Sequence, residues 1–315
     1  MDYILLLVGF LFLIKGADGF VSGASSIAKK FSIPPLIIGL TIVAFGTSAP
    51  EAAVSITAAI NGQNDMAIAN VVGSNIFNFL IVIGVTSMLK PIKVQKTTIV
   101  KDFPFVTLCS IVFAIITCDT LLQNSTENML SRADGLILIA LFAIFMYYLF
   151  EIALTSKEQQ EEEEIKEIAL SKSIIYCLLG VAGIVAGGQL VVNAASNIAL
   201  AWGMSENLVG LTIVSVGTSL PELVTSIVAA KKGESDIAIG NAVGSNIFNL
   251  LFVLGISSII HNIAVAPVVF YDIAVMIFVT DLTYLFSITK KTINRGEGAV
   301  LASLYVIYLA YIIMR

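Results

Sequence analysis

The sequence predicts an all-α polytopic membrane protein in which ten transmembrane helices form two inverted repeats of five helices. Three observations predict this fold. First, 57% of the 315 residues are hydrophobic and only 12% are charged, with a mean hydropathy of +0.96, and soluble globular proteins do not have this composition. Second, ten apolar segments are long enough to cross a hydrocarbon core, which takes about 20 helical residues. Third, much of the sequence of the first half is repeated in the second half.

The ten apolar segments are centred near residues 14, 46, 78, 109, 143, 186, 218, 249, 277 and 305. The first contains Lys15 and Asp18, three positions apart, which we expect to pair within the helix. It has no small-residue cleavage site and leads directly into the second span, so a removable signal peptide is not expected. The second, third, seventh and eighth segments carry repeated polar motifs, and we expect these four helices to be broken.

The internal repeat fixes the relation between the halves. Residues 39–59 match residues 210–230 at 14 of 21 positions, and residues 65–84 match residues 236–255 at 14 of 20, both at an offset of 171. Because each half holds five spans and five is odd, the second half enters the bilayer from the opposite side. Inverted repeats with interrupted helices place a site near the midplane and offer two related packings that open to opposite sides. We therefore expect alternating access.

The two repeats are expected to cover residues 1–153 and 173–315, joined by an acidic linker at residues 154–172. The linker holds a run of glutamates without the pattern of a calcium-binding loop, which favours a solvated cytoplasmic segment over a calcium sensor. With the N-terminus outside, 14 of the 17 Lys and Arg residues fall in inner loops, as the positive-inside bias requires. The sequence therefore predicts a multi-pass protein of the plasma membrane with both termini outside.

The first repeated motif, G-T-S-x-P-E, places a carboxylate inside an apolar span. Thr47 and Ser48 lie four and three residues before Glu51 and share its helix face. Pro50 has no N–H to donate to the carbonyl of Gly46, so the turn around it is loosened. A carboxylate in hydrocarbon is expensive and is normally found where it meets a cation, a proton or a water-filled path. The second copy supplies Thr218, Ser219, Pro221 and Glu222, and the two glutamates together suggest one divalent site.

The second motif, N-x-x-G-S-N-I-F-N, follows each copy of the first. Its members that share a helix face at a spacing of four are Ser74 with Asn78 and Ser245 with Asn249. Calcium takes six to eight oxygen ligands at about 2.3 to 2.6 Å, and carboxylate, hydroxyl, amide and backbone oxygens can supply them. Neither motif contains Cys or His, so a soft transition metal fits poorly. We expect Asn70 and Asn241 to cap or tie the broken third and eighth helices rather than to contact an ion.

Together these motifs resemble the alpha-repeats of the cation/calcium antiporter superfamily, in its sodium/calcium exchanger branch, and the resemblance spans the whole chain. It implies a ten-helix fold in which helices 2, 3, 7 and 8 surround a diamond of cation sites while helices 1 and 6 slide across that core. The implied calcium ligands are Glu51, Glu222, Thr47 and Thr218. The implied outward sodium site takes Glu51, Ser48, Thr218, Ser245 and the carbonyl of Ser215. The implied inward sodium site takes Glu222, Ser219, Thr47, Ser74 and the carbonyl of Ala44, and Asn78 and Asn249 flank the centre.

Two positions bear on the coupling ion. Asn249 stands where the potassium-dependent branch and some archaeal relatives carry Asp, which disfavours potassium cotransport. The proton-coupled exchangers carry a G-N-x-x-E pattern where this chain has Gly73-Ser74 and Gly244-Ser245, which favours sodium coupling. The resemblance thus predicts a secondary active antiporter that exchanges Na⁺ for Ca²⁺ by alternating access and extrudes Ca²⁺. A proton- or potassium-coupled cation exchanger and, from another class, a cation channel stay open as alternatives.

An enzyme is not expected. The lone His261 has no nucleophile arranged around it, and the two glutamates belong to symmetry-related copies rather than to an acid/base pair in unequal environments. No cofactor, nucleic acid or obligate protein partner is expected. The expected ligands are the transported Ca²⁺ and Na⁺, and the surroundings are a lipid bilayer.

Overall fold

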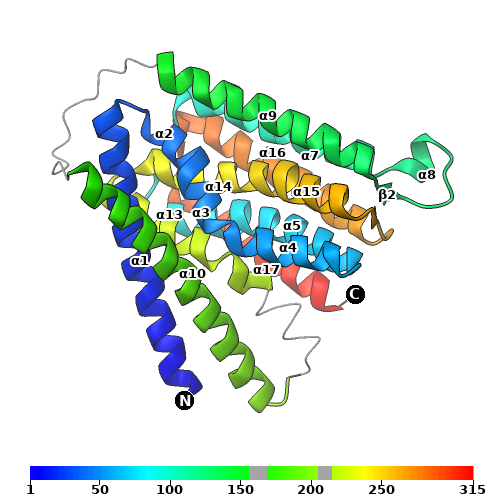
Figure 1. Cartoon of the computed structure of the whole chain (residues 1–315), viewed down its shortest axis with the longest axis horizontal. Helices are drawn as coiled ribbons and strands as arrows, with labels where there is room; N and C mark the ends of the chain where they lie inside the picture. Colours follow the sequence, from blue (N-terminus) through cyan, green and yellow to red (C-terminus); the bar gives the residue numbers. More distant parts are fainter. Residues whose placement is uncertain (156–168, 205–214, 315) are drawn as a thin grey trace.

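The computed structural model describes residues 1–155, 169–204 and 215–314, which are almost entirely helical (Figure 1). Within these ranges, eight helices are long and apolar enough to cross a membrane, and nine if the bent pair Pro35–Thr47 and Ala49–Ile60 counts as one span. The chain is therefore a multi-pass, all-α membrane protein, as predicted. The remaining expected span, centred near residue 218, extends into residues 205–214, which lie outside the described residues.

The helical elements follow the order of the apolar segments. The α-helices are α1 (Asp2–Phe31), α2 (Pro35–Ile38), α3 (Ala44–Thr47), α4 (Ala49–Ile60), α5 (Asn64–Phe77), α6 (Gly84–Leu89), α7 (Phe103–Ile116), α8 (Asp119–Leu122), α9 (Arg132–Thr155), α10 (Leu170–Ala201), α12 (Ser215–Thr218), α13 (Leu220–Lys232), α14 (Ser235–Ile247), α15 (Leu254–Ile260), α16 (Val269–Ile288) and α17 (Arg295–Met314). The π-helical segments are η1 (Gly39–Val43), η2 (Asn78–Ile83), η3 (Thr98–Asp102) and η5 (Phe248–Val253), and η6 (Thr289–Lys291) is a 3₁₀ turn. The glutamates of the expected acidic linker lie outside the described residues.

The second and seventh spans are broken at single serine residues. Ser48 separates α3 from α4 with φ −83° and ψ 6°, and the helix bends by 52° there. Ser219 separates α12 from α13 with nearly the same geometry, φ −93° and ψ 5°. In both copies a proline occupies the first turn of the new helix, where its missing N–H is not needed. These two breaks were expected from the sequence.

In the third and eighth spans the expected interruption takes another form. The chain stays in helical geometry from α5 through η2 to α6, and from α14 through η5 to α15, but η2 and η5 are π-helical. Neither span contains a proline, so nothing removes a backbone donor, and the distortion is limited to a widened turn. The widened turns begin at Asn78 and beside Asn249, and π-helical turns in α-helices are frequently found at functional sites.

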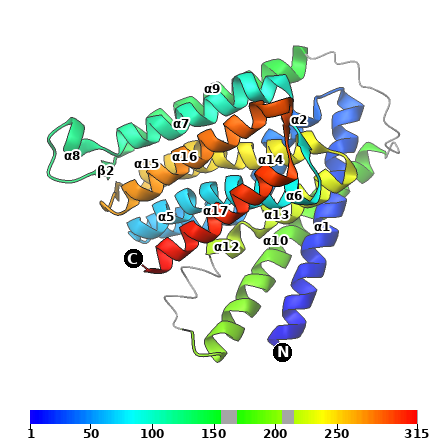
Figure 2. The same ribbon diagram turned by 180° about the vertical axis from the view of Figure 1, so that it is seen from behind.

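Glycines join α1 and α10 into a closely packed pair. Gly9, Gly16 and Gly23 recur every seventh residue of α1 and face α10. A Cβ on Gly16 would lie 2.8 Å from the carbonyl oxygen of Gly180, and one on Gly187 would lie 2.7 Å from that of Gly9. The two backbones therefore touch, as in small-residue helix packing in membranes. Figures 1 and 2 show the pair side by side and at an angle to the other helices.

The broken helices pack just as tightly in the core of the fold. A Cβ on Gly244 of α14 would lie 2.7 Å from the carbonyl oxygen of Leu40 in η1, and one on Gly39 would lie 3.0 Å from the Cα of Ile237. Backbone contact between the second and eighth spans thus brings the first half against the second. This contact sets the distance between the segments that carry the polar motifs.

Two short antiparallel sheets, which the sequence analysis did not predict, also join the halves. Strand β1 (Ile92–Lys93) pairs with β4 (Thr292–Ile293), and β2 (Met129–Leu130) pairs with β3 (Ile263–Ala264). Each strand is only two residues long and lies in a connection between spans. The prediction of an all-helical chain therefore needs this small addition.

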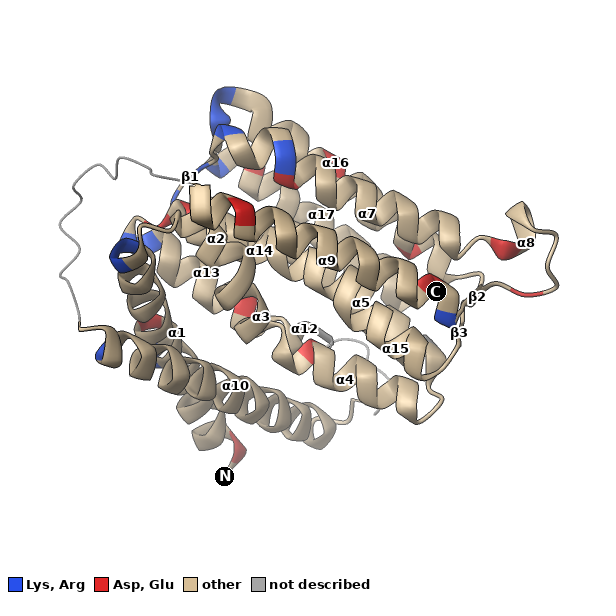
Figure 3. Ribbon diagram, turned by 45° about the horizontal axis from the view of Figure 1, so that its top comes forward, with Lys and Arg blue, Asp and Glu red and all other residues tan. Residues whose placement is uncertain are grey.

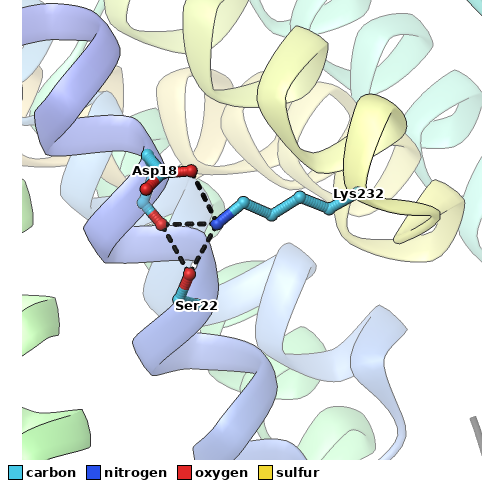
Figure 4. A network of polar contacts seen from close by, with 3 residues as sticks. All are labelled: Asp18, Ser22 and Lys232. Atoms are coloured by element: carbon cyan, nitrogen blue, oxygen red, sulfur yellow. Dashed lines mark hydrogen bonds and ion pairs between the residues drawn. The ribbon is translucent and has the colours of Figure 1, made fainter. Parts of the chain in front are cut away.

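Charges are distributed unevenly along the bundle. Figure 3 shows most of the Lys and Arg residues at the end that holds β1 and α2. The expected ion pair between Lys15 and Asp18 is wrong. Instead, Lys232 Nζ at the end of α13 lies 2.9 Å from Asp18 Oδ1 and 2.8 Å from the Asp18 carbonyl oxygen, and it also bonds Ser22 Oγ (Figure 4). Asp18 therefore pairs with Lys232 of another helix, which makes three contacts with α1, and not with Lys15 of its own helix.

Candidate cation site

The two helix breaks bring Ser48, Glu51, Ser219 and Glu222 together. Ser48 Oγ donates to Glu222 Oε1 at 2.8 Å, and Ser219 Oγ donates to Glu51 Oε1 at 3.0 Å. Each serine therefore bonds the carboxylate of the other half, in two contacts related by the offset of 171. None of these four residues is more than 1% exposed. Both acids are buried in one place between the halves.

Ser74 and Thr47 extend this group. Ser219 Oγ also lies 3.1 Å from Ser74 Oγ. Because Ser219 has one hydroxyl proton and an ionised carboxylate can only accept it, Ser74 is the donor in that second contact. Thr47 Oγ1 lies 3.0 Å from Asn241 Oδ1 and 3.1 Å from the Val43 carbonyl oxygen. Hydroxyl oxygens from both halves thus surround the carboxylates.

Asn70 and Asn241 tie the helices that carry the glutamates. Asn70 Nδ2 donates to the carbonyl oxygen of Glu51 at 3.2 Å and to Ser55 Oγ at 2.8 Å. Asn241 Nδ2 donates to the carbonyl oxygen of Glu222 at 3.2 Å and to Ser226 Oγ at 2.9 Å. These bonds tie the third helix to the second and the eighth helix to the seventh, whereas the expectation was that the two residues cap or tie the third and eighth helices themselves. Their bonds fix the first turns of α4 and α13, and therefore the position of each carboxylate.

Asn75 and Asn246, which the sequence analysis did not single out, join the third and eighth spans. Asn75 Nδ2 donates to the Asn246 carbonyl oxygen, and Asn246 Nδ2 donates to the Asn75 carbonyl oxygen, each at 3.2 Å. Two residues 171 positions apart that bond each other reciprocally lie about a local two-fold axis. The signal was present in the sequence, because both residues are identical members of the repeated second motif.

The other predicted site residues take the following places. Asn78 and Asn249 are buried and donate to Asn246 Oδ1 at 3.0 Å and to Asn75 Oδ1 at 3.3 Å, respectively. Ser245 is buried one turn before Asn249, and Thr218 is buried at the end of α12. The Ala44 carbonyl oxygen accepts the N–H of Ser48 at 2.9 Å and lies 3.3 Å from Thr47 Oγ1. Ser215 begins α12.

Several buried oxygens of these residues have no hydrogen-bond partner. They are Glu51 Oε2, Glu222 Oε2, Ser245 Oγ, Asn78 Oδ1 and Asn249 Oδ1. A buried polar atom without a partner is costly and calls for an explanation. All five are oxygens that can accept, and two belong to carboxylates that repel each other. This arrangement suits a cation, which would satisfy the oxygens and offset the repulsion.

The donor set indicates the kind of cation. In the described part of the chain no three His, Cys, Asp or Glu residues form a metal-binding group, so two carboxylates would act together with hydroxyl, amide and backbone oxygens. Hard cations such as Ca²⁺ and Na⁺ prefer such ligands. Both glutamates also lie in the first turn of a helix, where the helix dipole stabilises a negative charge.

Comparisons with known proteins show the family of the chain. The sequence model of the family described as "Sodium/calcium exchanger protein" matches residues 1–151 and 172–314. The putative antiporter CaxA of Alkalimonas amylolytica is 41% identical, with 97% of this chain and 96% of that protein aligned. The sodium/calcium exchanger MaX1 of Methanosarcina acetivorans is 32% identical, over 98% of this chain and 97% of that protein.

The fold matches a solved structure as well. The sodium-calcium exchanger NCX_Mj, soaked with Na⁺ and Sr²⁺, superimposes with a TM-score of 0.84 at 31% identity, covering 98% of this chain and 97% of that chain. Sequence model, relatives and structure agree, and the chain belongs to the sodium/calcium exchanger family of multi-pass membrane antiporters.

Proposed function

We propose that this antiporter exchanges Na⁺ for Ca²⁺ across the membrane. The observation that carries the proposal is the pair of buried carboxylates, Glu51 and Glu222, each bonded to a serine of the opposite half and each left with one unpartnered oxygen. One Ca²⁺ or several Na⁺ ions can neutralise this pair. The name of MaX1 and the ions present with NCX_Mj support the same choice.

The mechanism follows from the charge of the site. A closed, dry intermediate that holds two bare carboxylates is strongly unfavourable because their charges lose water and repel each other. Bound Ca²⁺ or Na⁺ removes this penalty and permits the change between the two packings of the inverted repeats. The site therefore changes sides when it is loaded, which makes exchange obligatory. Protons on the carboxylates are the remaining way to neutralise it.

The proposed ligands form one central Ca²⁺ site and two flanking Na⁺ sites, and each site takes residues from both halves. In this proposal Ca²⁺ binds between Glu51, Glu222, Thr47 and Thr218. Sodium binds on either side of that position. One Na⁺ site uses Ser48 and Ser245 with the carbonyl of Ser215, the other uses Ser219 and Ser74 with the carbonyl of Ala44, and Asn78 and Asn249 lie at the centre.

The direction of Ca²⁺ transport follows from the membrane potential. We place the end of the bundle that carries most Lys and Arg residues in the cytoplasm of a cell whose plasma membrane holds the protein. If more sodium charge than calcium charge crosses in each cycle, each net charge contributes about 2.3 kcal/mol per 100 mV. A negative interior then drives Ca²⁺ out of the cell.

The test is uptake of radioactive Ca²⁺ by vesicles that contain the purified protein. Vesicles loaded with Na⁺ should accumulate Ca²⁺ when the outer Na⁺ is removed, and vesicles loaded with choline should not. A proton-coupled exchanger would respond instead to a pH gradient, and a potassium-dependent one would need K⁺ inside. A channel would pass Ca²⁺ down its own gradient with no counter-ion. Uptake that ignores the Na⁺ gradient would refute the proposed coupling.

A further inference from the structure

The amides of Asn75 and Asn246 can be oriented without ambiguity. Each side-chain nitrogen faces the backbone carbonyl oxygen of the other residue at 3.2 Å. A carbonyl oxygen only accepts hydrogen bonds, so the side-chain atom that faces it must be the NH₂ group. The second N–H of Asn75 points to the sulfur of Met276 at 3.8 Å, which is also an acceptor. The oxygen end of each amide is therefore fixed.

This orientation is passed on to Asn78 and Asn249. Asn246 Oδ1 lies 3.0 Å from Asn78 Nδ2, and Asn75 Oδ1 lies 3.3 Å from Asn249 Nδ2. An amide oxygen must receive a donor, so the NH₂ groups of Asn78 and Asn249 face the central pair. Their own oxygens then point the other way. Both oxygens are buried, and no group of the described protein donates to them.

We propose that Asn75 and Asn246 are positioning residues that turn the amide oxygens of Asn78 and Asn249 toward the cations. The proposal rests on the proposed function. Without the central pair, either flanking amide is free to rotate and present its NH₂ group, whose hydrogens repel a cation. The central amides thus select an acceptor over a donor at two ligand positions. Helix packing alone would use the same bonds but would not depend on the orientation of the neighbours.

A double-mutant cycle separates these roles, because an aspartate carries oxygen at both ends and needs no orientation. Asn246→Ala removes the acceptor that holds Asn78, and Asn78→Asp removes the need for it. Binding of radioactive Ca²⁺ to purified protein is measured for both single variants and the double variant, with thermal unfolding in parallel. Asn246→Ala should weaken Ca²⁺ binding about 10-fold, the effect of one hydrogen bond to a charged or buried group. In the Asn78→Asp background the same change should weaken it less than 3-fold.

The outcomes are distinct. An equal loss in both backgrounds would mean that Asn246 only packs the helices, and it would overturn the positioning role. If Asn246→Ala does not fold, Asn75→Ala with Asn249→Asp gives the matching cycle in the other half. Wild-type protein that binds no Ca²⁺ would refute the proposed substrate, and the positioning role with it. Binding measured in this way does not depend on Na⁺ coupling, so failure of the coupling alone leaves the cycle readable.

A different observation supports a second proposal. Lys232 at the end of α13 holds Asp18 and Ser22 of α1 through an ion pair and a hydrogen bond (Figure 4). At the offset of 171, the equivalents of Asp18, Ser22 and Lys232 are Gln189, Asn193 and Asn61. These equivalents are uncharged, and Gln189 Nε2 donates to Asn193 Oδ1 at 2.9 Å within α10.

The asymmetry bears on the two packings that inverted repeats allow. In the described structure α1 packs along α13, whereas α10 does not pack along α4 in the same way. Exchanging the roles of the halves would bring Gln189 and Asn193 toward Asn61, where no ion pair can form. We infer that Asp18 and Lys232 form a latch that favours the packing seen here over its alternative. This inference also rests on alternating access in the proposed function.

The latch is tested by the populations of the two packings. Spin labels on α1 and α13, and in a second sample on α10 and α4, report the two distances by pulsed electron resonance. Asp18→Asn should shift the ratio of the packings about 5-fold toward α10 on α4, within the range of exposed ion pairs. Lys231→Gln, at a neighbouring lysine, is the control and should leave the ratio unchanged. The double variant Asp18→Lys with Lys232→Asp should restore it, and an unchanged ratio in Asp18→Asn would overturn the latch.

Discussion

The glycine contacts between α1 and α10 allow a sharp test of the fold. In Gly16→Ala the new Cβ would lie 2.8 Å from both the Gly180 carbonyl oxygen and the Ile184 nitrogen. The helices must move apart by roughly 0.5 Å, and a gap of that size forfeits about a quarter of the dispersion energy of the atoms along it. Overpacking of this kind costs about 1 to 3 kcal/mol. We expect a clearly lower unfolding temperature.

Gly19→Ala is a matched control on the same helix. A Cβ at Gly19 would meet only the Tyr176 carbonyl oxygen, at an ordinary 3.8 Å. Both substitutions gain the same helix propensity, about 0.5 to 1 kcal/mol relative to glycine, so the difference between them measures the contact with α10. Thermal unfolding in detergent, followed by circular dichroism, should place Gly19→Ala at or above wild type. Equal unfolding temperatures for the two variants would refute the close packing of α1 on α10.

Further predictions concern the site. Glu51→Gln and Glu222→Gln should each abolish Na⁺-driven Ca²⁺ uptake at normal expression, because the one remaining carboxylate charge cannot balance Ca²⁺. The control variant Glu127→Gln, in an exposed connection, should transport Ca²⁺ normally. Near-normal uptake in either site variant would defeat the assignment of the site. Ser219→Ala should raise the Ca²⁺ concentration for half-maximal uptake more than Ser48→Ala, since Ser219 contacts both a carboxylate and a second hydroxyl while Ser48 contacts one carboxylate. A lost hydrogen bond to a charged group corresponds to about 1.5 to 3 kcal/mol, and the reverse order in the two serine variants would contradict this hydrogen-bond arrangement.

The spans and the two helix breaks could be predicted because their causes are local. Apolar length defines a span, and Pro50 and Pro221 each begin a new helix after a serine. The convergence of the glutamates followed from the inverted repeat, since similar segments in opposite orientation meet about a common axis. Those features depend on residues close in sequence or on an exact offset.

Other features depend on how segments that are distant in the sequence pack against each other. Asp18 could pair with Lys15 by spacing, but Lys232, 214 residues away, reaches it through the packing of α13 on α1. The third and eighth spans carry polar motifs as the second and seventh do. Because they contain no proline, they widen into π-helical turns and do not break. The role of Asn75 was hidden because a repeated asparagine in an apolar helix has the same pattern whether it binds an ion, packs a helix or orients a neighbour.

The two short sheets have a consequence for assembly. Each pairs a strand from the first half of the chain with a strand from the second, β1 with β4 and β2 with β3. The connections that follow the third and fourth spans therefore find their backbone partners only after most of the second repeat has been synthesised. Although the halves share repeated motifs, each has strand edges whose backbone partners lie in the other half, so separately expressed halves should need each other to reach the native state.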